Sequence, residues 1–211
     1  MPQPRADYVR GALRRADVDP EDPLAEVRAW VAEAVAAAVA EPTAAVLSTV
    51  DEAGRPDARV VLVRDVDARG AVWFSNHRST KGRQLATSPV AALTWFWPSM
   101  ERQIRLRGEV EHLETAASDA YWAGRPRGSQ LASAASEQSA VVADRATLEA
   151  RFEEVAAAHA GGAAVPRPSH WGGRRLVPVE VELWQGRPAR LHDRLRWRRA
   201  TGGWVLERLM P

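Results

Sequence analysis

The sequence contains no cysteine, which excludes disulfide bonds, thiolate metal sites and cysteine nucleophiles. No uninterrupted apolar stretch approaches the roughly 20 residues that a membrane-spanning helix needs. The first residues, MPQPRADYVRG, lack the apolar centre of a secretory signal. These absences predict a cytoplasmic protein with no membrane partner.

Lysine is almost absent too: Lys81 is the only one, although lysine and arginine together number 29. The net charge is +2, and acidic residues alternate with the arginines along the chain. Nucleic-acid-binding proteins usually gather basic residues on one face, so no nucleic-acid partner is expected. Lys81 has two interpretations, a solvated surface position or a site that needs a compact ammonium group.

Several catalytic signatures are missing. No GxGxxG, P-loop, GxSxG or HExxH motif occurs in the chain. The five histidines share no metal-ligand spacing. Hydrolase and metalloenzyme functions are therefore disfavoured, and no metal site is predicted.

The hydrophobic pattern predicts about eight strands and four helices in a single domain. Helices are expected over 22–41, 79–87, 115–124 and 144–160, and strands over 43–50, 58–66, 71–76, 90–97, 102–113, 175–186, 189–199 and 203–210. Loops are expected over 125–139 and 161–173. Because the strands follow one another as hairpins, the pattern predicts an α+β protein, an antiparallel barrel with attached helices.

Two polar segments suit a phosphate ligand. Lys81 is expected in the first turn of the 79–87 helix with Ser79 as its cap, and a helix start offers free N–H groups to an anion. In RPRGSQ (125–130), two arginines and a serine alternate, and arginine forks bind phosphate oxygens in pairs. An exposed polar helix explains Lys81 equally well, and for RPRGSQ taken alone a solvated loop is favoured.

A third group lies near the C-terminus. The segment RLHDR would place Arg190, His192 and Arg194 on one face of a strand. Three polar, potentially cationic side chains on one face indicate a pocket or an exposed sheet. Trp171 and Trp184 suit either the core or a ring-stacking role.

Together, these motifs resemble the pyridoxamine 5′-phosphate oxidase family. The segments that carry the resemblance, from about Tyr8 to Pro211, are EPTAAVLSTVDEAGRP, RVVLVR, MERQIRLRGEVE, RPRGSQ, VPRPSHWGG, WQGRPARLHDRLRW and ERLMP. The resemblance implies one FMN-binding antiparallel split β-barrel with flanking helices over residues 1–211, and a homodimer with FMN at the interface. Residues 1–21 would form a mobile N-terminal segment, and 175–211 the strands for dimerisation and substrate binding.

The resemblance also implies roles for individual residues. The implied cofactor-binding residues are Arg59, Val60, Val61, Leu62, Phe74, Ser75, Thr80, Lys81, Gln103, Gln138, Ser139, Trp184 and Arg194. The implied substrate-binding residues are Arg5, Tyr8, Arg64, Tyr121, Arg125, Ser129, Arg190 and His192, of which the last two would be catalytic, beside the substrate ring.

The implied reaction oxidises pyridoxamine 5′-phosphate or pyridoxine 5′-phosphate to pyridoxal 5′-phosphate. O2 is the implied acceptor and gives H2O2, and the amine substrate also releases NH3. Two alternatives stay open: a related flavin-dependent oxidase of the phenazine-biosynthesis type acting on a different ring substrate, and a non-catalytic flavin- or pyridoxal-phosphate-binding protein. The RPRGSQ segment favours the B6 substrate, and the presence of Arg190 and His192 disfavours a non-catalytic role.

The sequence departs from the family pattern at three places. Arg64 stands where lysine is usual, Thr80 where arginine is usual, and QLASAAS (130–136) lacks the glycine and tryptophan of the usual QxGAWAS. Thr80 removes one cation from the phosphate site, which predicts that Lys81 bears more of the phosphate's charge. The other two departures would alter the substrate pocket.

Overall fold

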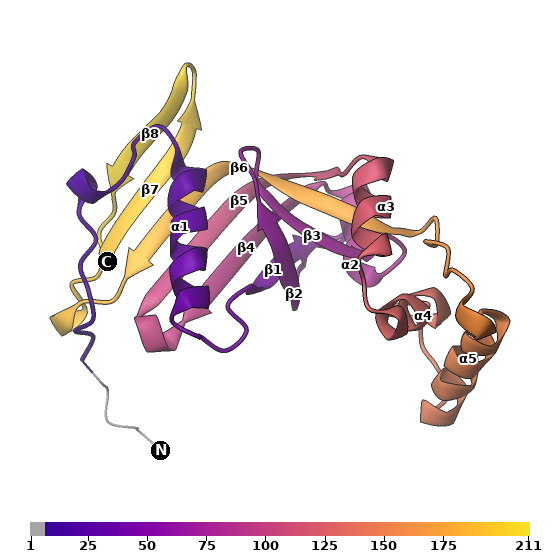
Figure 1. Ribbon diagram of the computed structural model, residues 1–211. Coiled ribbons are helices and arrows are strands. Elements are labelled where there is room, and N and C mark those ends of the chain that lie inside the picture. Colours follow the sequence, from indigo (N-terminus) through magenta and orange to yellow (C-terminus); the bar gives the residue numbers. More distant parts are fainter. Residues whose placement is uncertain (1–6) are drawn as a thin grey trace.

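In the computed structural model, described for residues 7–211, eight strands form one antiparallel sheet whose first six members close into a barrel (Figure 1). The strands are β1 (Ala44–Val50), β2 (Pro56–Val66), β3 (Ala71–Asn76), β4 (Val90–Trp97), β5 (Arg102–His112), β6 (Trp171–Gln185), β7 (Asp193–Ala200) and β8 (Gly203–Arg208). Their order is β3-β2-β1-β4-β5-β6-β7-β8, and a further pairing of β3 with β6 closes the barrel. The predicted α+β split barrel is confirmed.

Strand β6 belongs to two parts of the sheet. Its first half, from Trp171 to Leu176, pairs with β3, whereas its second half, from Glu180 to Gln185, pairs with β7. The β5–β6 register shifts between Arg107 and Gly108, and such irregularities bend a strand. Strand β6 therefore leaves the barrel, and β7 and β8 extend the sheet beyond it.

Large apolar side chains fill the barrel, and they follow the alternation expected of strands. In β5, Ile104 and Leu106 are fully buried, while Arg105 and Arg107 point to the other face. Helix α1 (Pro23–Ala36) adds Trp30 to the same core. The fully buried members of this core include Leu47, Trp73, Leu93, Trp95, Leu176, Leu183, Leu195 and Trp197.

Four further helices are α2 (Thr80–Thr87), α3 (Thr115–Ala123), α4 (Arg127–Ala135) and α5 (Arg145–Ala158). Figure 1 shows α4 and α5 beyond one end of the barrel, and β7 and β8 beyond the other. A separate small core of Trp122, Leu131, Val165 and Trp171 joins the helices to the start of β6. Within residues 7–211, no helix is long and apolar enough to cross a membrane.

The described part of the N-terminal segment rests on the extended sheet. The backbone N–H of Arg10 donates to Glu101 Oε2 at 2.9 Å, and that of Leu13 donates to Asp193 Oδ2 at 3.1 Å. Leu13 is buried in the main core. That residues 1–21 are mobile stays a prediction.

Several predicted bounds were wrong. The segment 125–139, predicted as a loop with at most one helical turn, contains the nine-residue helix α4, because Leu131 packs into the small core and stabilises a helix in a small, polar segment. The first helix ends at Ala36 instead of residue 41, since Ala38 has a left-handed φ of 50°. The strand predicted over 189–199 begins at Asp193.

The predicted loop 161–173 also ended too late, since β6 begins at Trp171. Gly172 and Gly173 pair with Ser75 and Phe74 of β3. A Cβ on Gly173 would lie 2.5 Å from Leu113 Cδ1. Glycine is required because the neighbouring side chains occupy the space above the strand, and not because the chain turns there.

Candidate functional site

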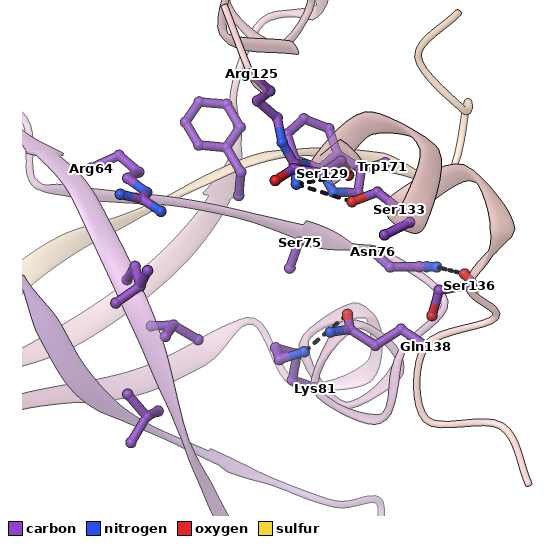
Figure 2. Close-up of a pocket in the computed structure, with 15 residues that line it drawn as sticks. Arg64, Ser75, Asn76, Lys81, Arg125, Ser129, Ser133, Ser136, Gln138 and Trp171 are labelled. Atoms are coloured by element: carbon purple, nitrogen blue, oxygen red, sulfur yellow. Dashed lines mark hydrogen bonds between the residues drawn. The ribbon is translucent and has the colours of Figure 1, made fainter. Parts of the chain in front are cut away.

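A cavity of about 430 Å³ lies between β2, β3, the start of α2 and α4 (Figure 2). It brings together ten of the residues predicted to bind cofactor or substrate, which are Val60, Val61, Leu62, Arg64, Phe74, Ser75, Lys81, Arg125, Ser129 and Gln138. Strand β2 supplies an apolar wall, and the cationic side chains lie at two ends of the cavity. Lys81 of α2 forms one end, and Arg64 of β2 with Arg125, which lies just before α4, forms the other.

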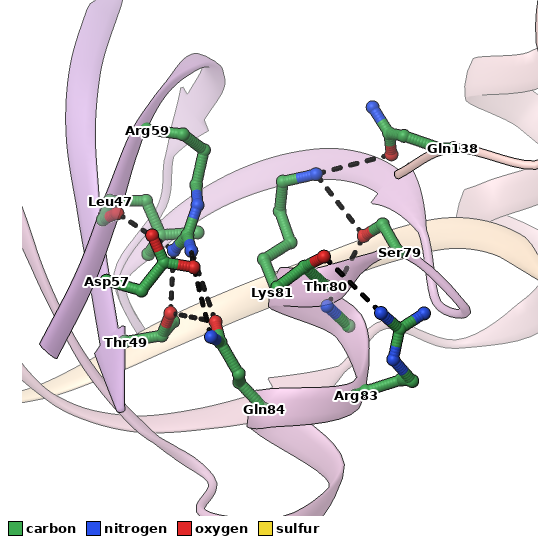
Figure 3. Close-up of polar contacts among 11 residues, drawn as sticks. Leu47, Thr49, Asp57, Arg59, Ser79, Thr80, Lys81, Arg83, Gln84 and Gln138 are labelled. Carbon is green, nitrogen blue, oxygen red and sulfur yellow. Dashed lines mark hydrogen bonds and ion pairs between the residues drawn. The ribbon is translucent and has the colours of Figure 1, made fainter. Parts of the chain in front are cut away.

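Lys81 forms the first cationic end. Its side chain is 7% exposed, and Nζ donates to Ser79 Oγ at 3.3 Å and to Gln138 Oε1 at 3.2 Å (Figure 3). Burial lowers the pKa of the Lys81 ammonium, and the positive charge of Arg59 lowers it further, while the negative charge of Asp57 acts in the opposite direction without reversing the shift. Within residues 7–211, no carboxylate forms an ion pair with this ammonium. A buried cation held only by neutral partners suits an external anion.

The start of α2 is built by Ser79, which confirms the predicted cap. Ser79 Oγ accepts the backbone N–H of Gly82 at 3.3 Å and donates to the carbonyl of Asn76 at 2.7 Å. Thr80 does not line the cavity, and its hydroxyl accepts from Arg83 Nη2 at 3.4 Å. Thr80, which was predicted to bind the cofactor, thus neither lines this end of the cavity nor brings a positive charge to it.

Ser75 supplies an unsatisfied donor in the same cavity. Its Oγ is buried and has no hydrogen-bond partner within the described residues. A buried hydroxyl without a partner costs about 1–3 kcal/mol, and a ligand oxygen in the cavity would remove that cost. Together with Lys81, this hydroxyl gives a donor set that fits a phosphate-bearing cofactor.

Arg59 stands behind this end instead of lining the cavity. Its Nη1 donates to the carbonyl of Leu47 at 3.1 Å and to Thr49 Oγ1 at 2.6 Å, and its Nη2 pairs with Asp57 (Figure 3). These partners use much of the donor capacity of the guanidinium. Arg59 therefore contributes positive charge near Lys81, but its guanidinium has few donors left for a ligand.

Arg125 forms the second cationic end. Its Nη2 donates to Ser133 Oγ at 3.0 Å and to the carbonyl of Ser129 at 3.2 Å. Its guanidinium lies 4.5 Å from the ring centroid of Trp171, a cation–π contact. Burial lowers the pKa of Arg125, and the positive charge of Arg64 acts in the same direction.

A second cavity of about 500 Å³ shares Arg64, Arg125 and Ser129 with the first and is also lined by Tyr121. The Tyr121 ring stacks on Phe74 with centroids 3.7 Å apart and 6° between the planes. Four predicted substrate residues, Arg64, Tyr121, Arg125 and Ser129, are therefore together. They surround the boundary of two adjoining cavities.

Five of the other predicted residues form a second group at the β7 end of the sheet. The Trp184 ring lies 4.7 Å from His192 and 5.6 Å from Tyr8. Gln103 and Arg194 are the register partners of Trp184 on the two neighbouring strands. None of these five lines the first cavity. One copy of the chain therefore holds two separated parts of the predicted site.

The prediction that Arg190, His192 and Arg194 share one strand face was wrong, because only Arg194 lies in β7. Arg190 is exposed and has a left-handed φ of 62°, following Ala189 with a φ of 54°. Such conformations are strained for residues other than glycine. His192 Nδ1 accepts the backbone N–H of Arg187 at 3.1 Å, so the neutral ring carries its proton on Nε2.

Besides Arg59, Thr80 and Arg190, two further predicted residues belong to neither group. Arg5 lies outside the described residues. Ser139 is exposed, has a φ of 72° and does not line the first cavity, although its neighbour Gln138 does.

Some residues of the cavity were missed. Ala132, Ser133 and Ser136 face it from α4 and the residue that follows, and Asn76 and Trp171 face it from β3 and β6. The helical spacing of residues 129, 132, 133 and 136 could have revealed the α4 face. Glu182 was also missed: it is 3% exposed and accepts from Arg105 at 3.0 Å and Arg194 at 2.8 Å.

Comparisons with known proteins agree with this geometry. The family profile described as "Pyridoxamine 5'-phosphate oxidase" matches residues 31–159. The chain belongs to the pyridoxamine 5′-phosphate oxidase family. It is thus a member of a family of flavin-dependent oxidoreductases. A second profile, "Pyridoxine 5'-phosphate oxidase C-terminal dimerisation region", matches residues 171–211, which indicates a homodimer.

Curated members of the pyridoxamine 5′-phosphate oxidase family match nearly the whole chain. A pyridoxine/pyridoxamine 5′-phosphate oxidase of Burkholderia thailandensis is 50% identical over 210 residues, which cover 98% of this chain and 97% of the relative. Pyridoxine/pyridoxamine 5′-phosphate oxidase 1 of Ralstonia nicotianae is 52% identical over 208 residues with the same coverage.

Solved structures of relatives share the fold. PhzG from Burkholderia lata, in complex with tetrahydrophenazine-1-carboxylic acid, is 34% identical with a TM-score of 0.90, covering 97% of this chain and all of PhzG. A pyridoxamine 5′-phosphate oxidase-related, FMN-binding protein from Nostoc punctiforme has a TM-score of 0.73 at 19% identity, covering 90% of this chain and 98% of that protein. The second likeness shows the fold alone.

Proposed function

We propose that this protein uses FMN to oxidise pyridoxamine 5′-phosphate or pyridoxine 5′-phosphate to pyridoxal 5′-phosphate. O2 would be the acceptor, H2O2 a product, and NH3 a further product of the amine. The observation that carries the proposal is one cavity with two cationic ends, Lys81 at one and Arg64 with Arg125 at the other. Such a cavity suits two phosphate-bearing molecules that lie side by side against β2, with one phosphate at each cationic end.

The cofactor end fits FMN by its donor set. Lys81, the orphaned hydroxyl of Ser75 and the start of α2 would hold the phosphate, and Gln138 would fix Lys81. The backbone of β2 from Val60 to Leu62 would lie along the flavin ring. When bound, FMN supplies the two-electron redox chemistry, which no side chain of this protein can supply.

The substrate end would bind the second phosphate. Arg125 is already oriented by Ser133 and by the Trp171 ring. Arg64 is exposed and makes no hydrogen bond or ion pair within residues 7–211, so its planar fork is available to the phosphate oxygens. Tyr121 and Ser129 would add hydroxyl donors from the adjoining cavity. Arginine at both positions matches a dianionic phosphate.

A partner subunit would complete each site. The outer faces of β1, β2 and β4 carry exposed apolar residues: Val46, Val60, Leu62 and Phe96 are 40%, 62%, 37% and 49% exposed. A second copy would bury them and bring its Trp184 group to the cavity. The match of residues 171–211 to a dimerisation region supports this arrangement, because that region carries Trp184, His192 and Arg194.

His192 and Arg190 would act on the substrate ring. Because His192 Nδ1 is occupied by the N–H of Arg187, its Nε2 proton points away from that bond and is available to the substrate. Trp184 and Tyr8 pack against the imidazole and hold its plane. Arg190, with no partner in the described residues, would steady negative charge that develops at the reacting carbon.

A second candidate function is oxidation of a carboxylated tricyclic ring, as the name of the PhzG complex suggests. One observation favours it: the helix face toward the cavity carries only small side chains, Ala132, Ser133 and Ser136. Small side chains on this face leave room for a ring larger than that of a B6 phosphate. The carboxylate of such a ring could bind Arg125.

A steady-state assay separates the two functions. The purified protein, supplied with FMN in air, should convert pyridoxamine 5′-phosphate to pyridoxal 5′-phosphate with stoichiometric H2O2. Unphosphorylated pyridoxamine and tetrahydrophenazine-1-carboxylic acid serve as comparison substrates. Turnover of the tricyclic acid without turnover of either B6 phosphate would favour the second function, and no turnover with bound FMN would contradict both.

A further inference from the structure

Arg174 is a buried arginine without a counter-ion. It lies in β6 and is 2% exposed. Within residues 7–211 its side chain makes one long hydrogen bond, from Nη2 to the carbonyl of Gly82 at 3.5 Å, and its Nε has no partner. Its neighbour Arg175, in contrast, forms ion pairs with Asp67 and Glu111.

The charge of Arg174 is not neutralised by its surroundings. Arginine stays protonated in proteins, and an unpaired charge is costly to bury. Burial lowers the pKa of His77 to about 4, and the positive charge of Arg174 is the second cause. Burial and then Arg174 also lower the pKa of His112. The two histidines on which this charge acts are therefore kept neutral, and within residues 7–211 no carboxylate forms an ion pair with the guanidinium.

The position of Arg174 relates this charge to the cofactor end of the cavity. Gly82 lies in the first turn of α2, directly after Lys81. A Cβ on Gly82 would lie 2.1 Å from the carbonyl of His77, so this turn packs tightly on the chain beneath it. Arg174 Nη2 thus contacts the carbonyl of the residue that follows Lys81 in the same helical turn. Thr80, in that turn, contributes no charge.

We propose that Arg174 supplies a further positive charge to the cofactor-phosphate site from inside the fold, beside those of Lys81 and Arg59, acting through the first turn of α2. The phosphate in turn stabilises the buried guanidinium, which forms no ion pair with a carboxylate of residues 7–211. Arg174 is a positioning residue in this role, because Gly82 and Lys81 lie between it and the ligand. The inference rests on the proposed use of FMN.

The test compares FMN with riboflavin, which has the same ring system and no phosphate. The full-length protein is stripped of flavin, and both dissociation constants are measured by flavin fluorescence for the wild type and Arg174→Met. Arg174→Met should weaken FMN binding about tenfold, as expected for loss of one charge near a buried anion. Riboflavin binding should change less than about twofold, because a neutral ligand has no such interaction.

Arg175→Met is the matched control, since it removes the adjacent arginine of the same strand, whose charge is already paired. It should lower stability without changing the ratio of the two dissociation constants. Arg174→Lys, which keeps the charge, should restore most of the preference for FMN. An equal loss of FMN and riboflavin affinity in Arg174→Met would overturn the proposal. If the wild type bound neither flavin, the proposed function itself would fail.

A measurement on the wild type keeps the proposal testable if Arg174→Met does not fold. The pKa of His112 is followed by NMR with riboflavin bound and then with FMN bound. The FMN phosphate should offset the charge of Arg174 and raise the pKa of His112 toward its ordinary value. An unchanged pKa would contradict the coupling between the phosphate and Arg174.

Discussion

Lys81 Nζ donates to Gln138 Oε1 at 3.2 Å, which connects the start of α2 to the segment after α4. Nearby, Asn76 Nδ2 donates to the carbonyl of Ser136 at 3.4 Å. These two bonds join the cofactor end of the cavity to the helix that carries the substrate end. An anion that orders Lys81 would therefore also help to order the segment after α4.

Lys81→Ala should weaken FMN binding about 10–100-fold, because one charge-assisted hydrogen bond contributes roughly 1.5–3 kcal/mol. The protein should purify with little flavin, as judged by the ratio of its visible to its ultraviolet absorbance. Arg83→Ala, on the exposed side of α2, is the control and should retain flavin. A colourless control or a fully yellow Lys81→Ala protein would contradict the assignment.

Ser133→Ala should raise KM for pyridoxamine 5′-phosphate about 3–10-fold, because Arg125 loses a hydrogen bond of about 1 kcal/mol that orients its guanidinium. FMN affinity should stay the same, since Ser133 acts at the other end of the cavity. Steady-state kinetics with FMN in excess measures both. An unchanged KM would show that the Ser129 carbonyl and Trp171 position Arg125 without Ser133.

The sequence predicted the strands more reliably than the site. Alternating residues such as Ile104 and Leu106 identify a strand locally, and all eight strands exist. Helix α4 was missed because its stability comes from Leu131 packing on distant Trp122 and Trp171, which local composition does not encode.

The cavity was predictable where a short motif places its residues, as with Lys81 at a helix start. Arg174 could not be identified from sequence, because its importance depends on burial and on the absence of a counter-ion. The role of Glu182 likewise depends on two arginines from neighbouring strands. The importance of Arg174 and of Glu182 therefore becomes visible only from tertiary contacts, which local sequence does not encode.

Arg64→Lys, which restores the residue usual in the family, should change KM for the B6 phosphate several-fold while FMN occupancy stays similar. A lysine offers a single ammonium where arginine offers two parallel donors. Steady-state kinetics and flavin content give the two quantities. If neither KM nor kcat changes, Arg64 does not contact the substrate phosphate.

His77→Gln should reduce the loss of stability in acid. The pKa of His77 is lowered from 6.5 to about 4, so the unfolded chain binds a proton that the folded protein does not between these values. Stability from this group is complete above pH 6.5 and is lost as the pH falls toward 4. Thermal unfolding across this range should show a shallower decline for His77→Gln than for the wild type or His159→Gln.

Two inactive variants should complement each other if each site draws on two subunits. In a mixed dimer of Lys81→Ala and His192→Ala chains, one site receives both wild-type residues and the other receives neither. Random exchange should restore about one quarter of wild-type activity, because half the dimers are mixed and each has one intact site. Sites built within one chain would show no recovery.

The most direct test of the central claim is a single turnover without oxygen. The protein, purified with its flavin, is mixed anaerobically with pyridoxamine 5′-phosphate while its visible absorbance is followed. We predict loss of the flavin absorbance, formation of one pyridoxal 5′-phosphate per flavin, and return of the absorbance when air is admitted. A flavin absorbance that stays unchanged with both B6 phosphates would contradict the proposed function.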